Sequence, residues 1–374
     1  MTITAGTQRT LVSLVAACLL FVATGSAAAA PKSAIMPADV SPVLKYLLDL
    51  VNNQDGHGFD AHRVHPLISF MQAHKAHDTV FRADGTFDAP SAYHEFRVNS
   101  DLKRLLGYIY NTNIPSFFLW PSSLRLAQWT RVDGGEEQLD QLRSAADELK
   151  GPIVIKGTER ATITPDQHTG AYYSYDVDKM VILTPLEQGM ALISVYIQRE
   201  PSAVGRKGWV LGDDDDWSYL YTQETGLNVG GLGWVSTYMY DSFGMTVYYQ
   251  PDPDTPVLDC AVVSWVKAGW AGINMVQPKH IHRGLVRVST AFKAILENPR
   301  LPDPNVLAET FSDSKNLPTA TLKAYGKDYF QRLEKRLTAA ETLRKKLGQA
   351  LDVETALAQM TREELYAALA LDYF

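Results

Sequence analysis

The sequence contains few cysteines and no excess of positive charge. Its 374 residues include only Cys18 and Cys260, too few for a small fold held together by disulfides. The 35 Lys and Arg residues are outnumbered by 42 Asp and Glu residues, which gives a net charge of −7. Because nucleic-acid binding requires a basic surface, this balance predicts that nucleic acid is not a partner.

Long apolar runs and established catalytic motifs are also scarce. Beyond the N-terminus, no stretch reaches the roughly 20 apolar residues of a spanning helix, so we expect no transmembrane helix in the mature chain. The metalloprotease pattern HExxH, the haem-attachment pattern CxxCH and the nucleophile pattern GxSxG do not occur. These absences favour a non-catalytic protein, and the sequence predicts no cofactor other than a transition metal.

The N-terminus has the three-part layout of a secretory signal peptide. Arg9 precedes an apolar core at 11–24, and small residues follow at Ala27–Ala30. We therefore predict a signal peptide over 1–29 and a periplasmic or secreted protein of bacterial type. The run that ends at Cys18 resembles a bacterial lipobox, which keeps a lipoprotein as an alternative. The apolar core continues past Cys18, however, and this favours ordinary cleavage.

Four regions follow the signal peptide. Residues 30–150 are predicted to be mainly helical, because caps and apolar positions recur there at helical spacing. Residues 151–297 form an antiparallel sheet with a covering helix. Residues 298–318 are rich in proline and are predicted to be a linker. Residues 319–374 form a helical C-terminal tail.

The sheet region shows short runs of β-branched and aromatic residues that alternate with turn residues. The seven or eight candidate strands are 152–164, 171–184, 189–199, 208–211, 217–224, 234–240, 244–250 and 257–267. The short separators leave no room for crossover helices, so neighbouring strands should pair in an antiparallel meander. Residues 278–297 then carry apolar side chains at steps of three and four, which predicts an amphipathic helix.

The predicted fold class is therefore α+β. It consists of a curved antiparallel β-meander of seven or eight strands, covered by a helix and flanked by N- and C-terminal helical regions. A meander that ends in an amphipathic helix resembles the helix-grip folds of START-like lipid carriers, and the resemblance covers 151–297. Those folds usually place helices between the early strands, and none is predicted here. We therefore assign no family.

Aromatic residues are concentrated in the central part of the predicted sheet. Their alternation places them in two groups of three, each on one face of a strand. Tyr and Trp combine a large apolar area with a polar group, which suits the wall of a ligand cavity or a partner surface. The candidate ligand-binding residues are Trp217, Tyr219, Tyr221, Trp234, Tyr238 and Tyr240. Packing of these rings against neighbouring elements is the alternative.

Histidines are concentrated before the sheet, and five of the nine lie between His57 and His77. Imidazole is a common ligand of zinc, copper, nickel and iron. Two pairs with HxxH spacing could converge on one tetrahedral ion. The candidate metal ligands are His62, His65, His74 and His77. A histidine-rich, partly exposed helical hairpin is the alternative.

These observations favour an exported, non-catalytic protein that binds an apolar or amphipathic small molecule on the aromatic face. One alternative is a metal-binding protein or metal-dependent enzyme that uses the histidines between His57 and His77. Another is a structural or assembly protein of the cell envelope, in which the same aromatic face contacts a protein partner. The sequence leaves these three functions open.

Overall fold

The computed structural model describes most of the chain that follows the predicted signal peptide. It covers residues 32–339, with gaps at 53–57, 74–78, 84–86, 146–148, 165–169, 212–217 and 230–232, and a few residues between 357 and 366. Ser33–Phe374 forms one unit. The predicted signal peptide at 1–29, including Cys18, lies outside the described residues and stays a prediction.

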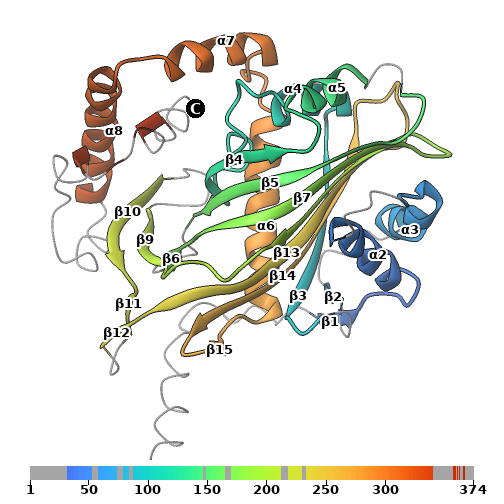
Figure 1. The fold of residues 1–374 in the computed structure, drawn as a ribbon, viewed down its shortest axis with the longest axis horizontal. Helices are drawn as coiled ribbons and strands as arrows, with labels where there is room; N and C mark the ends of the chain where they lie inside the picture. The colour runs from blue at the N-terminus through green and yellow to red at the C-terminus, as the bar shows by residue number, and fades with distance from the viewer. Residues whose placement is uncertain are drawn as a thin grey trace, which may run out of the picture. The chain divides into compact units, whose positions relative to one another are not determined.

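A ten-stranded antiparallel sheet organises this unit (Figure 1). In chain order its strands are β1 (Lys32–Ile35), β2 (Thr79–Arg82), β3 (Ser91–Val98), β4 (Leu124–Val132), β5 (Ile153–Ile163), β7 (Ser174–Pro185), β8 (Met190–Gln198), β13 (Thr237–Gln250), β14 (Leu258–Trp270) and β15 (Ile273–Asn274). In space the order is β1-β2-β3-β14-β13-β8-β7-β5-β4, and β15 pairs with β14. The centre of the sheet is therefore a meander, with strands from the first part of the chain at both edges.

Two small sheets are formed by four strands between β8 and β13 together with β6, which precedes β7. The first has the order β10-β9-β6, and the second pairs β11 with β12. Their strands are β6 (Gly170–Tyr172), β9 (Arg206–Leu211), β10 (Ser218–Thr225), β11 (Leu227–Val229) and β12 (Gly233–Val235). The candidate strands 208–211 and 217–224 therefore belong to a separate sheet. A periodicity shows that a segment is extended, but it does not show which strand pairs with it.

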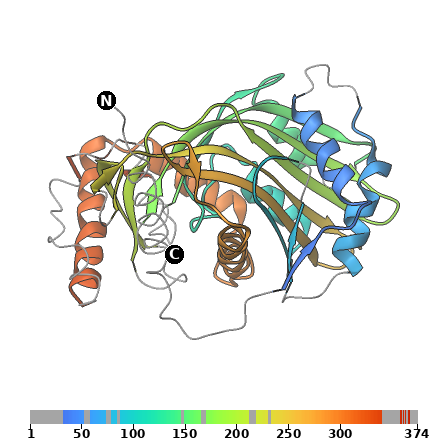
Figure 2. The same cartoon turned by 90° about the horizontal axis from the view of Figure 1, so that it is seen from below.

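Helices lie against both faces of the main sheet. The helices are α2 (Ser41–Asn52), the short 3₁₀ helix η2 (Ala61–Val64), α3 (His65–Ala73), α4 (Leu102–Ile109), α5 (Glu137–Ala145), α6 (Pro278–Leu296), α7 (Pro304–Lys315) and α8 (Thr319–Ala339). Helix α6 lies beneath the arched sheet and is seen nearly end-on in Figure 2. Helices α2 and α3 lie on the other side of the sheet (Figures 1 and 2).

The alternation of side chains along each strand produces two hydrophobic clusters, one on each face. In β7, Val181 and Leu183 pack with α4 and α6, whereas Met180 and Ile182 pack with α2 and α3. All four side chains are almost completely buried. A strand with both faces covered has an unbroken apolar run instead of an alternating one, and this explains the sequence Met180–Leu183.

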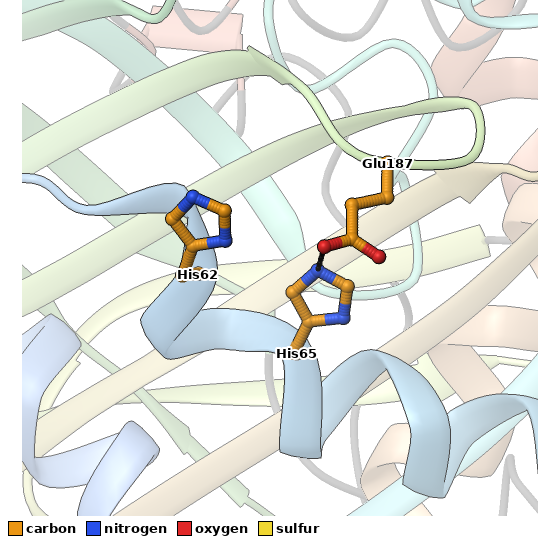
Figure 3. Close-up of side chains that lie close together, drawn as sticks. All are labelled: His62, His65 and Glu187. Atoms are coloured by element: carbon orange, nitrogen blue, oxygen red, sulfur yellow. Dashed lines mark ion pairs between the residues drawn. The ribbon is translucent and has the colours of Figure 1, made fainter.

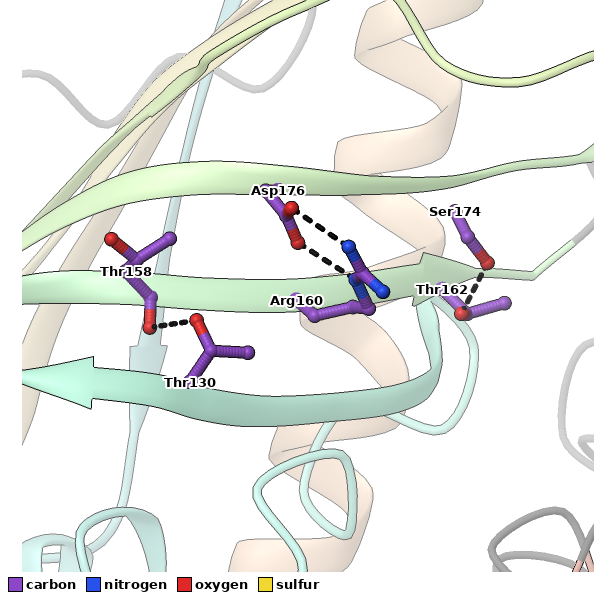
Figure 4. Close-up of polar contacts among 6 residues, drawn as sticks. All are labelled: Thr130, Thr158, Arg160, Thr162, Ser174 and Asp176. Carbon is purple, nitrogen blue, oxygen red and sulfur yellow. Dashed lines mark hydrogen bonds and ion pairs between the residues drawn. The ribbon is translucent and has the colours of Figure 1, made fainter.

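The sheet is polar on its outer face near β4, β5 and β7 (Figure 4). Arg160 on β5 donates two hydrogen bonds to Asp176 on β7, at 2.7 and 2.8 Å. The hydroxyls of Thr162 and Ser174 are 2.6 Å apart on the same pair of strands. Successive side chains of a strand point to opposite faces, so the residues on either side of Arg160 in β5 face α6. The polar side chains of these two pairs therefore lie on the face away from α6.

The structure confirms the predicted fold class, a curved antiparallel sheet covered by an amphipathic helix. The helix predicted over 278–297 is α6, and Pro278 occupies its first turn. Region 30–150 contains the expected helices but also contributes four strands to the sheet. Region 298–318, predicted to be a linker, contains α7, because Pro304 begins a helix and the side chain of Asp303 caps it.

Candidate functional site

A cavity of about 480 Å³ lies between α6 and the sheet. Strands β4, β5, β7, β8, β13 and β14 form one wall, and helices α4 and α6 contribute the other. This volume is within the range of roughly 300–1,000 Å³ that is typical of small-molecule sites. Most of the lining side chains are apolar or aromatic, and a small number of polar groups lie among them.

An aromatic cluster around Phe292 forms one part of this wall. The Phe292 ring stacks on Trp120, with ring centroids 5.6 Å apart and planes 13° apart. Tyr248 from β13 lies at 5.6 Å from the same ring, and Phe96 from β3 lies edge-on at 6.1 Å. These four rings join α6 to the loop before β4 and to the sheet. They therefore fix the position of the helix over the cavity.

A buried ion pair lies in the sheet wall of the cavity. Lys179 Nζ on β7 is 2.5 Å from Glu159 Oε2 on β5. The lysine side chain is 16% exposed and the glutamate side chain 7% exposed. Lys179 Nζ also lies 5.2 Å from the centre of the Trp129 ring, within the range of a cation–π contact. A buried charge is tolerated when it is paired and hydrogen-bonded, so each of these two groups holds the other in the wall.

Tyrosine hydroxyls supply further polar groups in the cavity. The hydroxyl of Tyr110 is hydrogen-bonded to Ser194, and that of Tyr248 is hydrogen-bonded to Trp120. The Tyr175 hydroxyl lies 3.5 Å from the hydroxyl of Ser242. Burial raises the pKa of all three tyrosines, because the phenolate would be poorly solvated. The three hydroxyls therefore remain protonated, and that of Tyr175 donates its hydrogen bond to Ser242.

Helix α6 contributes a cation to the cavity. Arg287 lines it, and its Nε and Nη1 atoms are buried without a hydrogen-bond partner among the described residues. Gly284, one turn earlier, also lines the cavity, and a Cβ atom placed there would meet nothing within 4 Å. Arg287 is spaced by four residues from Arg283, which is exposed, yet Arg287 itself lines the cavity.

The predicted metal ligands His62 and His65 come together at the start of α3 (Figure 3). Their rings are stacked with centroids 6.2 Å apart. Glu187, from the turn between β7 and β8, completes a group whose ligand atoms lie within 4.8 Å of one another. Its carboxylate is 3.9 Å from His65 Nε2. Glu187 was not predicted, because the pairing of a distant turn with α3 has no local signal. His74 and His77 lie outside the described residues.

Of the six predicted aromatic ligand-binding residues, the three whose side chains the structure describes do not line the cavity. Tyr238 and Tyr240 are stacked on β13, with centroids 6.1 Å apart, and neither is among the lining residues of the cavity. Trp234 belongs to β12 and is 56% exposed. Trp217 and the side chains of Tyr219 and Tyr221 on β10 lie outside the described residues. Ligand contact by these six residues stays a prediction.

The cavity did have a signal in the sequence. The alternate positions Ile155, Gly157, Glu159, Ala161 and Ile163 of β5 form an apolar face that contains one carboxylate. The alternate positions of β7 likewise form an apolar face that contains one amine, Lys179. Single charges of opposite sign on two neighbouring inward faces indicate a buried pair. The predicted meander makes these two strands neighbours, but the sequence does not fix the register that places Gly157 opposite Lys179 and so brings Glu159 beside it.

Comparisons with known proteins add little to this geometry. No protein-family description matches the sequence, and no curated protein matches it either. Among solved structures, the human StarD13 (DLC2) lipid transfer and protein localization domain is similar at 12% sequence identity. The match covers 64% of this chain and 98% of that domain, with a TM-score of 0.26. At this TM-score the similarity does not support a functional argument, which rests instead on the chain's own cavity.

Within the part of the chain that the structure describes, no helix is both long enough and apolar enough to cross a membrane.

Proposed function

We propose that this protein binds an amphipathic small molecule in the cavity between α6 and the sheet. The observation that carries the proposal is the cavity itself, with a volume of about 480 Å³, a mostly apolar wall and a few convergent polar groups. This combination is characteristic of small-molecule sites. The aromatic rings around Phe292 would contact the apolar part of the ligand, and the tyrosine hydroxyls and charged groups would contact its polar part.

The arrangement of the charged groups in the cavity favours ligand binding over catalysis. Glu159 and Lys179 are paired with each other at 2.5 Å. A general acid or base must instead be free to exchange a proton with the substrate at hydrogen-bond distance. The ion pair therefore supports a role in holding the wall of the cavity together.

Gly284 provides a direct test. Gly284→Leu should place a side chain in the open space of the cavity, and overlap with a bound molecule costs on the order of 1–3 kcal/mol. We expect the affinity for the neutral fluorescent probe N-phenyl-1-naphthylamine to fall by about tenfold or more. The measurement is a fluorescence titration of the purified full chain, with chemical denaturation of the same samples.

Gly284→Ala is the matched control. It should raise the free energy of unfolding by about 0.5–1 kcal/mol, because alanine favours the helix, and it should retain probe binding. Equal binding by the two variants would show that the probe does not occupy this cavity. If the unmodified protein binds no apolar probe, the proposed function is wrong.

Metal binding at His62, His65 and Glu187 is a second candidate function. It is favoured by the convergence of two imidazoles and one carboxylate, with ligand atoms within 4.8 Å of one another. Three such ligands plus a water molecule are a common arrangement for Zn²⁺. Helix α3, which begins at His65, lies on the face of the sheet opposite to α6 and the cavity (Figures 1 and 2). The two sites are therefore separable by mutation.

For this site we expect Zn²⁺ to bind to the full chain and to be removed by a chelator. His62→Ala or Glu187→Gln should lower the affinity by at least the roughly 10–100-fold that loss of an outer-shell partner costs. Calorimetric titration with Zn²⁺ measures this, and Glu200→Gln on an exposed loop is the charge-matched control. A double variant, His74→Ala with His77→Ala, tests the four-histidine prediction. Unchanged affinity in the His62 and Glu187 variants would overturn the three-residue site.

A further inference from the structure

We infer that the head group of the ligand is an anion and that Arg287 of α6 binds it. This inference rests on the proposed function, since it concerns the same cavity. Three charged side chains are among the described lining residues: Glu159, Lys179 and Arg287. The first two form an ion pair with each other. The charge of Arg287 therefore has no counter-ion within the cavity wall.

The hydrogen-bonding groups of Arg287 lead to the same conclusion. Its Nε and Nη1 atoms are both buried, and neither has a hydrogen-bond partner among the described residues. A guanidinium has five N–H donors and no acceptor. Burying such donors without a partner is costly. A bound hydrogen-bond acceptor would satisfy these two nitrogen atoms.

The position of Arg287 on the helix makes this possible. His280, Gly284 and Arg287 are spaced by four and three residues, so they follow one flank of α6, and all three line the cavity. Gly284 has open space beside it. A ligand can therefore approach the guanidinium along this flank without displacing a side chain.

A carboxylate is the head group that matches these donors best. It presents two oxygens to one guanidinium, and charge-assisted hydrogen bonds of this kind are about twice as strong as neutral ones. The rest of the cavity is lined by aliphatic and aromatic side chains such as Ile281, Leu285 and Val288 of the same helix. The class of ligand is thus a carboxylate-headed amphiphile with an apolar body.

The test compares laurate, which carries a carboxylate, with dodecanol, which has the same chain length and no charge. Both are measured by displacement of N-phenyl-1-naphthylamine from the full chain. We expect the unmodified protein to bind laurate more tightly. Arg287→Gln should weaken laurate binding by roughly tenfold to a hundredfold, the range for loss of hydrogen bonds to a charged group, and should leave dodecanol binding nearly unchanged.

Arg283→Gln is the matched control, because it removes the same charge from an exposed position of the same helix that does not line the cavity. It should leave the preference for laurate intact. Arg287→Lys keeps the charge with fewer donors and should give an intermediate affinity, and far-ultraviolet circular dichroism of each variant checks that the overall fold is retained.

The displacement experiment distinguishes an incorrect head group from an incorrect binding site. If dodecanol binds as tightly as laurate, or if the Arg287→Gln and Arg283→Gln variants behave alike, the anionic head group is wrong while the binding cavity stands. If neither amphiphile displaces the probe from the unmodified protein, the proposed function itself fails. If Arg287→Gln lowers the affinities for laurate and dodecanol by the same factor, the inference is also wrong, because such a result would indicate a structural role for the arginine.

Discussion

Lys179→Met is expected to lower the free energy of unfolding by about 3–5 kcal/mol, because it leaves the carboxylate of Glu159 buried without its counter-ion. The pair is 2.5 Å apart, and the glutamate side chain is only 7% exposed. Water can therefore replace little of the lost interaction. Urea denaturation, followed by tryptophan fluorescence, measures the change at equilibrium.

The double variant, Glu159→Gln with Lys179→Met, separates the ion pair from simple packing. It removes both charges, and replacing a buried pair in this way is often neutral or slightly stabilising. We therefore expect it to recover most of the stability that the single variant loses. Lys45→Met is the surface control, because Lys45 and Asp49 are both more than half exposed and such a pair contributes about 0–1 kcal/mol. If Lys179→Met lowers the free energy of unfolding by no more than Lys45→Met does, the buried ion pair does not stabilise the fold as expected.

Phe292→Ala should be comparably destabilising, by about 3–5 kcal/mol, for a different reason. Phe292 is 1% exposed and contacts the rings of Trp120, Tyr248 and Phe96. Removing its ring leaves a void at the point where α6 meets the sheet. The surrounding rings come from three separate segments, so they cannot close the void together. Urea denaturation again measures the loss.

Phe292→Leu and Val286→Ala are the controls for this prediction. Leucine keeps most of the apolar volume, so a cost below about 1.5 kcal/mol is expected. Val286 lies on the same helix but is 37% exposed, and its truncation should change the stability by about 0.5 kcal/mol or less. If Phe292→Ala costs no more than Val286→Ala, the ring cluster does not hold α6 in place.

Part of the fold could be predicted from local pattern. The apolar stripe at steps of three and four predicted α6 to within one residue at its C-terminal end. Short separators predicted the antiparallel pairing of β7 with β8 and of β13 with β14, because strands joined by a tight connection pair with each other. These features depend on residues that are close in sequence, and the local pattern is sufficient for them.

The edges of the sheet could not be predicted in the same way. β3 pairs with β14, and Asp259 on β14 accepts a hydrogen bond from Arg97 on β3, 162 residues away in sequence. No periodicity within a strand specifies such a distant partner, because many strands have compatible inward faces. For the same reason β9 and β10 were predicted to belong to the main meander, whereas they form a separate small sheet with β6.

The candidate site shows the same division. The sequence by itself determined the type of architecture, the amphipathic helix and the presence of single charges on otherwise apolar strand faces. Only the tertiary structure decided that Glu159 meets Lys179, that Arg287 faces the cavity and that Glu187 joins His62 and His65. Glu187 meets His65 across more than 100 residues of sequence, whereas Glu159 and Lys179 lie on neighbouring strands of the meander and depend on the exact register of their pairing. Their geometry follows from how the sheet curves around α6, which is a property of the packed molecule and not of any one segment.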